Sequence, residues 1–197
     1  MSERTPLVGV YGLGRFGKFW GGLLSQKMRV IGASRSWKKE LPEGITQCAV
    51  EDLAEAEAVF LCVAISAMED SSRTLAQVLR PEQLVLDTCS VKVFPSQVML
   101  ESFSPRQPLI ATHPMFGPDS ARGGVEGLPI IMHPLRHVTG EYDLWRERFG
   151  ALGLNIVEMS PDDHDREAAY TQGITHFVGR VLSRLELPES SIATLGY

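Results

Sequence analysis

Three glycines in one short segment, Gly12, Gly14 and Gly17, have the spacing of a phosphate-binding turn. They lie between an apolar run, Leu7–Tyr11, and an amphipathic run, Phe16–Gln26. In a strand–turn–helix unit the first glycine allows the tight turn, the second lets a pyrophosphate approach the backbone, and the third allows close packing of helix on strand. The alternative is a glycine-rich turn without a ligand. The residues expected to bind a dinucleotide are Gly12, Leu13, Gly14, Arg15, Phe16 and Gly17.

A second polar segment, Ser34-Arg35-Ser36, follows the next apolar run. Chains that bind NAD usually carry an acidic residue here, about twenty residues beyond the glycines, for the ribose 2′-hydroxyl. This chain carries a guanidinium and two hydroxyls instead, which suit the extra 2′-phosphate of NADP, whereas a carboxylate would repel it. The segment therefore predicts NADP rather than NAD. The alternative is that Arg35, like the neighbouring Lys38 and Lys39, is a solvated loop charge.

Two further polar clusters follow apolar runs, and ligands of open α/β sheets bind outside the carboxyl ends of strands. One cluster contains Ser90 and Lys92, and the other contains Thr112 and His113. His113 is the candidate acid or base, because histidine is the one side chain whose ordinary pKa lies near neutrality. A histidine before a proline is more often a structural hydrogen-bonding residue, but its place beside a dinucleotide-binding unit favours the catalytic interpretation.

A long helix is expected from about Pro161 to about Leu185, and Gln172 and His176 share one of its faces because they are four residues apart. They are either substrate contacts or a polar stripe on a solvated face. No spacing indicates a metal site. The remaining histidines are assigned surface or packing positions: His133, His137 and His164.

The elements that must position these residues alternate along the chain. Short apolar runs predict strands over Leu7–Tyr11, Arg29–Ala33, Ala58–Ile65, Leu84–Asp87, Leu109–Thr112, Leu128–Met132 and Leu154–Met159. Amphipathic stretches predict helices over Phe16–Gln26, Ala67–Leu79, Val93–Phe103 and Tyr142–Leu152. Runs such as Ala58–Ile65 are apolar on both faces, so helices must cover both sides of the sheet. We predict an α/β fold, a Rossmann-type doubly wound, mostly parallel sheet, followed by the start of an all-α domain.

Two short segments have the form of helix starts. Ser66 with Glu69 fits a capping box, in which the hydroxyl and the carboxylate each satisfy a backbone N–H. Ser160 before Pro161 fits an N-cap with proline at the first helical position. The second start marks the expected boundary between an NADP-binding domain, 1–159, and the beginning of a helical domain, 160–197.

Composition excludes several classes of protein. The 197 residues are 44% hydrophobic and 22% charged, with a net charge of -5, which gives no disordered bias and no footprint for nucleic acid or an anionic membrane. There is no signal-peptide pattern and no run of the roughly 18 apolar residues that a membrane span needs. Cys48, Cys62 and Cys89 form neither a C-x-x-C pair nor an even disulfide framework, so a reducing, cytoplasmic setting is expected.

The combined motifs resemble the prephenate/arogenate dehydrogenase family of tyrosine biosynthesis. The resemblance runs from Leu7 to the end of the chain and is carried by Gly12–Gly17, Asp87–Lys92, Thr112–Asp119 and His164–Gly179. It implies an NADP-dependent oxidative decarboxylation of prephenate to 4-hydroxyphenylpyruvate or of arogenate to tyrosine. The Ser-Arg-Ser segment and the Met-Phe-Gly-Pro loop most resemble the NADP-linked arogenate-type members.

The resemblance also implies roles for individual residues. His113 would take the proton from the ring hydroxyl as hydride leaves for the nicotinamide, with Ser90 hydrogen-bonded nearby. Lys92 would orient that loop or meet a substrate carboxylate. The residues expected at the substrate are Thr112, Gln172 and His176.

Members of this family continue into further helices, which form a homodimer and supply an arginine for a substrate carboxylate. This chain reaches only the second helix of that region, so residues 160–197 are expected to be an incomplete substrate and dimerisation domain. One alternative is a non-catalytic NADP-binding remnant or regulator. Another is a β-hydroxyacid dehydrogenase or imine reductase, which would need a lysine or aspartate on the long helix, where this chain has Gln172 and His176.

Overall fold

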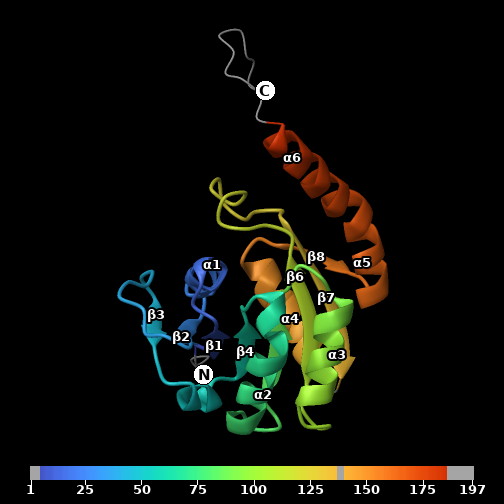
Figure 1. The fold of residues 1–197 in the computed structure, drawn as a ribbon. Coiled ribbons are helices and arrows are strands. Elements are labelled where there is room, and N and C mark those ends of the chain that lie inside the picture. The colour runs from blue at the N-terminus through green and yellow to red at the C-terminus, as the bar shows by residue number, and fades with distance from the viewer. Residues whose placement is uncertain (1–4, 137–139, 186–197) are drawn as a thin grey trace.

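The computed structural model describes residues 5–136 and 140–185. Within these ranges, eight strands form one sheet in the order β3-β2-β1-β4-β5-β6-β7-β8 (Figure 1). All neighbouring strands are parallel except β6 and β7, which are antiparallel. The strands are β1 (Leu7–Tyr11), β2 (Arg29–Ala33), β3 (Ile45–Gln47), β4 (Ala58–Leu61), β5 (Leu84–Asp87), β6 (Leu109–Pro114), β7 (Pro129–Arg136) and β8 (Asn155–Glu158).

Helices cover both faces of this sheet (Figure 1). They are α1 (Arg15–Leu24), α2 (Met68–Val78), α3 (Val93–Ser102) and α4 (Glu141–Ala151), with short 3-10 turns at η1 (Glu51–Glu55) and η2 (Ile65–Ala67). After β8, α5 (Pro161–Ala168), a π-helical turn η3 (Ala169–Gly173) and α6 (Ile174–Arg184) follow without a break. The expected Rossmann-type fold, followed by the start of an all-α segment, is confirmed. Within the described ranges, none of the helices combines the length and the apolar character that crossing a membrane requires.

The alternation of side chains along β4 shows why both faces need cover. Phe60 points into a cluster with Trp20 of α1 and with Trp145 and Phe149 of α4. The next residue, Leu61, joins the cluster on the opposite face, which α2 and α3 supply. Each buried side chain of this size contributes about 1.5–3 kcal/mol, so the two clusters hold the sheet rigid below its carboxyl edge.

Some expected boundaries differ from the structure. The strand expected over Ala58–Ile65 ends at Leu61, and the following residues form a loop at the carboxyl edge of the sheet. The strand β3 was not predicted, because its three residues pair only with β2 and are too few for a periodic pattern. The strand expected over Leu128–Met132 continues to Arg136, since its antiparallel pairing with β6 extends that far.

The two expected helix starts have different outcomes. The capping box at Ser66 is wrong: α2 is preceded by Ala67 without a side-chain cap, and Glu69 pairs with Arg73 at 3.3 Å. The N-cap at Ser160 is confirmed, because its hydroxyl accepts from the Asp163 N–H at 3.2 Å. The second start matters most for the site, since it fixes the direction of α5.

Candidate active site

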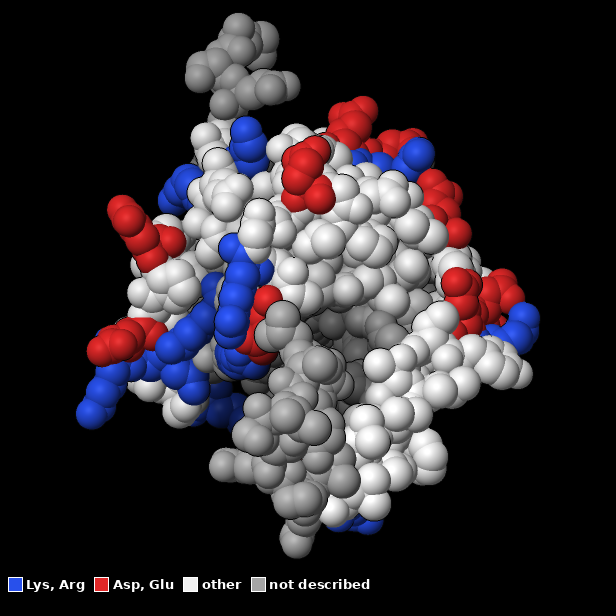
Figure 2. All heavy atoms as spheres, turned by 90° about the horizontal axis from the view of Figure 1, so that it is seen from above, with Lys and Arg blue, Asp and Glu red and all other residues white. Residues whose placement is uncertain are grey.

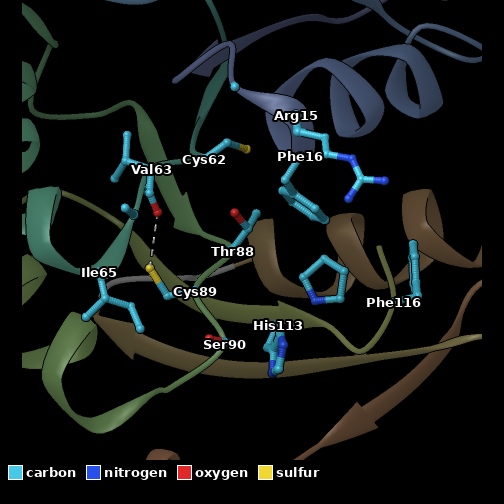
Figure 3. A pocket seen from close by; sticks show the side chains of 13 residues that line it. Arg15, Phe16, Cys62, Val63, Ile65, Thr88, Cys89, Ser90, His113 and Phe116 are labelled. Carbon is cyan, nitrogen blue, oxygen red and sulfur yellow. Dashed lines mark hydrogen bonds between the residues drawn. The ribbon is translucent and has the colours of Figure 1, made fainter. Parts of the chain in front are cut away.

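A cavity of about 530 Å³ lies at the carboxyl ends of β1, β4, β5 and β6. Figure 2 looks onto this end of the molecule, where the surface is hollowed and basic side chains gather on one side. A second hollow of about 250 Å³ adjoins it and shares Gly14 and Cys62 with it. Figure 3 shows the larger cavity, which is lined by Gly14, Arg15, Phe16, Cys62, Val63, Ala64, Ile65, Thr88, Cys89, Ser90, His113, Pro114 and Phe116.

The glycine turn between β1 and α1 forms one wall of both hollows. Gly12 has φ 105°, and a side chain there would overlap the Cys62 carbonyl oxygen. A side chain at Gly17 would overlap the Gly12 carbonyl oxygen, so this glycine lets α1 approach the turn. A Cβ at Gly14 would meet no atom within 4 Å, because this residue faces the open hollows. The turn therefore has the close packing and the open backbone that a dinucleotide needs.

The start of α1 is suited to an anion. Gly14 is the N-cap, and neither a side-chain cap nor an acidic residue satisfies the first turn. Backbone N–H groups and the helix dipole at such an end favour a phosphate. The switch in strand order between β1 and β4 places this end where ligands of open α/β sheets bind.

The Ser34-Arg35-Ser36 segment lines the smaller hollow together with Lys38. The Ser34 hydroxyl donates to the Ser36 carbonyl at 2.8 Å, and Lys38 Nζ donates to the Ser36 hydroxyl at 2.9 Å. Arg35 is exposed, so its guanidinium is free to meet a ligand. Lys38, which was not among the residues expected to bind the cofactor, thus lines the same hollow as Arg35.

His113 lies on β6 and its side chain is 6% exposed, at the wall of the larger cavity (Figure 3). Its Nδ1 is 2.9 Å from Nε2 of His164, and Nδ1 of His164 is 2.8 Å from an Asp165 carboxylate oxygen. Burial is the main cause that lowers the pKa of His113 to about 3; the charge of Lys92 adds to this, and Asp165 opposes it more weakly. His113 is therefore neutral near pH 7 and has a lone pair to offer.

Of the two positions expected for His164, surface or packing, the structure shows the buried one, with a polar contact to His113 that the sequence did not indicate. His164 is 2% exposed and its ring contacts His113 edge-on, with centroids 5.1 Å apart. Spacing could not find this pair, because 51 residues separate its members. The only signal was that His164-Asp165 belongs to the segment that carries the family resemblance.

Lys92 is buried beside the cavity and is not among the residues that line it. Its side chain is 1% exposed, and its Nζ pairs with Asp87 and donates to the Thr112 carbonyl at 2.6 Å. Thr112 also turns inward: its N–H donates to the Asp87 carboxylate at 3.1 Å, and its hydroxyl donates to the Asp87 carbonyl. In this geometry, the side chains of Lys92 and Thr112 bond to other protein groups and are not placed to contact a substrate. Both residues instead tie the carboxyl ends of β5 and β6 together.

The remaining predicted site residues are Ser90, Gln172 and His176, and the structure describes the side chain of Ser90 alone among these three. Ser90 is exposed and lines the cavity beside His113. Gln172 and His176 lie on η3 and α6, but their side chains are outside the part of the structure that is described.

Burial is the main cause that raises the pKa of the thiols of Cys62 and Cys89 to about 12, so neither wall cysteine provides a thiolate. Among the described residues, no three metal-ligating side chains come together.

Comparison with known proteins decides the family. The family described as "Prephenate dehydrogenase, nucleotide-binding domain" matches residues 25–142. The chain belongs to this family. The match covers β2 through β7 and includes both His113 and the Ser34-Arg35-Ser36 segment.

Two curated relatives of this family member come from Arabidopsis thaliana. Arogenate dehydrogenase 1, chloroplastic, is 35% identical over 96% of this chain and 32% of its own length. Arogenate dehydrogenase 2, chloroplastic, is 33% identical over 96% of this chain and 56% of its own length. The chain thus spans between about a third and somewhat more than half of these relatives.

Two solved structures of prephenate/arogenate dehydrogenases have the same fold. Synechocystis arogenate dehydrogenase matches with a TM-score of 0.72 at 24% identity, over 96% of this chain and 76% of that one. The prephenate dehydrogenase from A. aeolicus in complex with hydroxyphenyl propionate and NAD+ matches with a TM-score of 0.75 at 18% identity, over 100% of this chain and 75% of that one.

Proposed function

We propose that this chain supplies the cofactor site and the base of an NADP-dependent dehydrogenase that oxidatively decarboxylates prephenate or arogenate. One observation carries the proposal: a buried, neutral His113 lines the same cavity as the open glycine turn. Oxidation of a carbinol removes a hydride from its carbon and a proton from its hydroxyl. It therefore requires a nicotinamide cofactor and a base beside the same cavity. Membership of the prephenate dehydrogenase family supports the substrate class.

The proposed cofactor site consists of the glycine turn and the polar segment after β2. The first turn of α1 would bind the pyrophosphate, because its N–H groups lack a side-chain cap. Arg35 and Lys38 would hold the 2′-phosphate, with Ser34 and Ser36 beside them. Among the described residues that line this hollow, none is acidic, which favours NADP over NAD.

At the other end of the cavity we assign the base to His113. When bound, the nicotinamide would accept the hydride. His113 Nε2 would take the proton from the ring hydroxyl, while Ser90 hydrogen-bonds near the same oxygen. Loss of carbon dioxide follows from aromatisation of the ring. General-base assistance of this kind contributes roughly 10²–10⁴-fold, and orientation of substrate and cofactor supplies the rest.

The helices after β8 are proposed to complete the site and to form a homodimer. We assign residues 1–159 to the cofactor domain and residues 160–197 to the start of the helical domain, from which Gln172 and His176 would reach the substrate. The apolar side chains exposed on α6 support an association through this helix: Ile174, Phe177, Val178, Val181 and Leu182. Light scattering on the full-length protein should give a dimer, and a monomer would contradict this assignment.

The test of function is an assay that follows the absorbance of reduced nicotinamide, with prephenate and arogenate, each with NADP and NAD. We expect turnover of at least one substrate with NADP in the wild-type protein. His113→Asn should lower turnover by roughly 10²–10⁴-fold and leave NADP binding by calorimetry unchanged. Absence of turnover with both substrates, or undiminished turnover in His113→Asn, would refute the proposal.

A further inference from the structure

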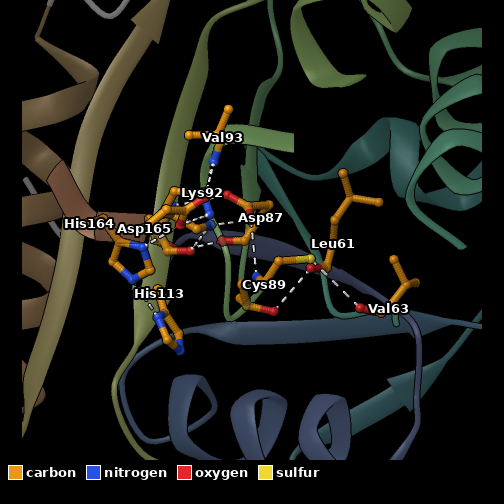
Figure 4. Close-up of polar contacts among 11 residues, drawn as sticks. Leu61, Val63, Asp87, Cys89, Lys92, Val93, His113, His164 and Asp165 are labelled. Atoms are coloured by element: carbon orange, nitrogen blue, oxygen red, sulfur yellow. Dashed lines mark hydrogen bonds and ion pairs between the residues drawn. The ribbon is translucent and has the colours of Figure 1, made fainter. Parts of the chain in front are cut away.

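Three side chains from two distant parts of the chain form a hydrogen-bonded line (Figure 4). Asp165 is followed by His164, both on α5, and His164 by His113 on β6. The two contacts measure 2.8 and 2.9 Å, within the range of hydrogen bonds. The line ends at the cavity, because His113 belongs to the cavity wall. Both histidine rings are almost completely buried.

The carboxylate of Asp165 sets the direction of these bonds. One of its oxygens accepts the Lys92 N–H at 2.6 Å, and the other accepts the Val93 N–H at 2.9 Å, at the first turn of α3. Burial alone would raise the pKa of Asp165, but hydrogen bonds from Val93, His164 and Lys92 outweigh it and lower the pKa. An ionised carboxylate can only accept, so the proton of this contact is on Nδ1 of His164.

The direction then passes from one ring to the next. A neutral imidazole with its proton on Nδ1 has an acceptor at Nε2. Nε2 of His164 therefore accepts from Nδ1–H of His113, and Nε2 of His113 is left without a proton. Between two neutral rings, the reverse direction would require a protonated Asp165, which three N–H donors around its oxygens oppose.

We propose that His164 and Asp165 are positioning residues that fix the tautomer of His113 and present its unprotonated Nε2 to the cavity. The inference rests on the proposed function, in which His113 is the base. When Nε2 takes the substrate proton, the cation that forms still donates from Nδ1 to His164, and Nδ1–H of His164 still points at the carboxylate. The proton stays on Nε2, so no shift along the line is needed.

Two variants of His164 separate hydrogen bonding from packing. His164→Phe keeps a buried ring but removes the acceptor for Nδ1–H of His113. His164→Gln keeps a side-chain oxygen at about the reach of Nε2 and is the conservative control. Asp165 is less suitable, because its carboxylate also accepts both N–H groups at the start of α3. Unfolding midpoints of both variants show whether each is folded before its other properties are compared.

The direct test is nuclear magnetic resonance of the full chain labelled with ¹⁵N in histidine, with His113→Asn used to assign the His113 signals. We expect the wild-type protein near neutral pH to have His113 protonated at Nδ1 and bare at Nε2. His164→Phe should shift the proton to Nε2, and His164→Gln should retain it on Nδ1. A proton on Nε2 in the wild type, or no change in His164→Phe, would overturn the proposal. This readout needs no substrate.

Kinetics then connects the tautomer to the reaction. With the substrate that the wild type turns over, His164→Phe should lower kcat by roughly 10²-fold, while His164→Gln recovers most of the rate and the KM for NADP stays unchanged. Unaltered kcat in a folded His164→Phe variant would overturn the positioning role. A wild-type protein with the expected tautomer but no turnover would instead refute the proposed function alone.

Discussion

The candidate site spans the two adjoining hollows, and its nucleotide end and its histidine end are built from different parts of the chain. At the nucleotide end, a backbone turn and exposed side chains such as Arg35 come from one continuous stretch around β1, α1 and β2. At the histidine end, side chains from β5, β6, the N-cap of α3 and α5 meet in one network that includes Lys92, His113 and His164. The first end faces solvent, whereas the second lies behind the cavity wall.

This difference governs what a substitution changes. An exposed cation at the nucleotide end is hydrated with or without ligand, so its loss should affect cofactor affinity and leave the fold unchanged. A buried polar group at the histidine end depends on its partner, because removing that partner leaves a desolvated charge or an unpaired donor. A substitution at the nucleotide end should therefore change ligand affinity without changing stability, whereas a substitution at the histidine end should change both activity and stability.

The largest effect should come from Lys92→Met. Lys92 and Asp87 are 1% and 0% exposed, and Met would leave the Asp87 carboxylate without its counter-ion. Breaking a buried pair by removing one partner costs about 3–5 kcal/mol. We expect a loss of this size in the free energy of unfolding, measured by urea denaturation near pH 7.

The matched control is the double variant Lys92→Met with Asp87→Asn, which removes both charges. It should recover part of the lost stability, because an amide still accepts from Thr112 and has no charge to desolvate. Equal stabilities of wild type and Lys92→Met would mean that the histidine end is not the coupled region that its burial indicates.

Arg35→Ala tests the nucleotide end. A charged hydrogen bond of the kind proposed for the 2′-phosphate contributes about 1.5–3 kcal/mol, so NADP affinity should fall by roughly ten- to a hundredfold. NAD affinity and the unfolding midpoint should not change. Calorimetry measures both affinities, and Arg29→Ala, at the opposite end of β2, is the control for loss of a surface cation. Equal loss of NAD and NADP affinity would remove Arg35 from the 2′-phosphate site.

The sequence predicted the nucleotide end better than the histidine end, for a physical reason. The glycine turn is formed by residues that are neighbours along the chain, so its backbone geometry can be recognised from a short stretch of sequence. His164 meets His113 only because β7 and β8 extend the sheet and α5 returns over its edge. The same long-range packing decides that Thr112 turns toward Asp87, a choice that no spacing encodes.

Acid should destabilise the protein through His113. Its pKa is about 3 in the folded state and about 6.5 when unfolded, so the unfolded chain binds the extra proton as the pH falls below 6.5. The stability due to the neutral ring is complete above that pH and declines as the pH falls toward 3. Between pH 7 and pH 5 the expected loss is about 2 kcal/mol. Burial lowers the pKa of His133 too, which adds to the loss in the same direction.

Urea denaturation of wild type and His113→Gln at both pH values isolates this contribution. The variant should lose less stability than wild type between pH 7 and pH 5, and the difference is the share of His113. Parallel pH dependences would show that His113 is not held neutral by its surroundings, which would weaken its assignment as a bare base.

The smallest effect should come from Asp119→Asn, because Asp119 is an exposed partner of Arg15, which lines the cavity. Asp119 accepts from Arg15 at 2.6 Å and from Arg122 at 3.0 Å, but all three side chains are more than half exposed. Water and salt screen such a pair, so the unfolding midpoint should stay within measurement error. NADP affinity should rise slightly, since Arg15 lines the cavity and would lose a competing anion, whereas Arg122→Ala, which leaves the Arg15 contact intact, should not change it. A marked loss of stability in Asp119→Asn would mean that the nucleotide end is also held by coupled polar contacts, and the contrast between the two ends would fail.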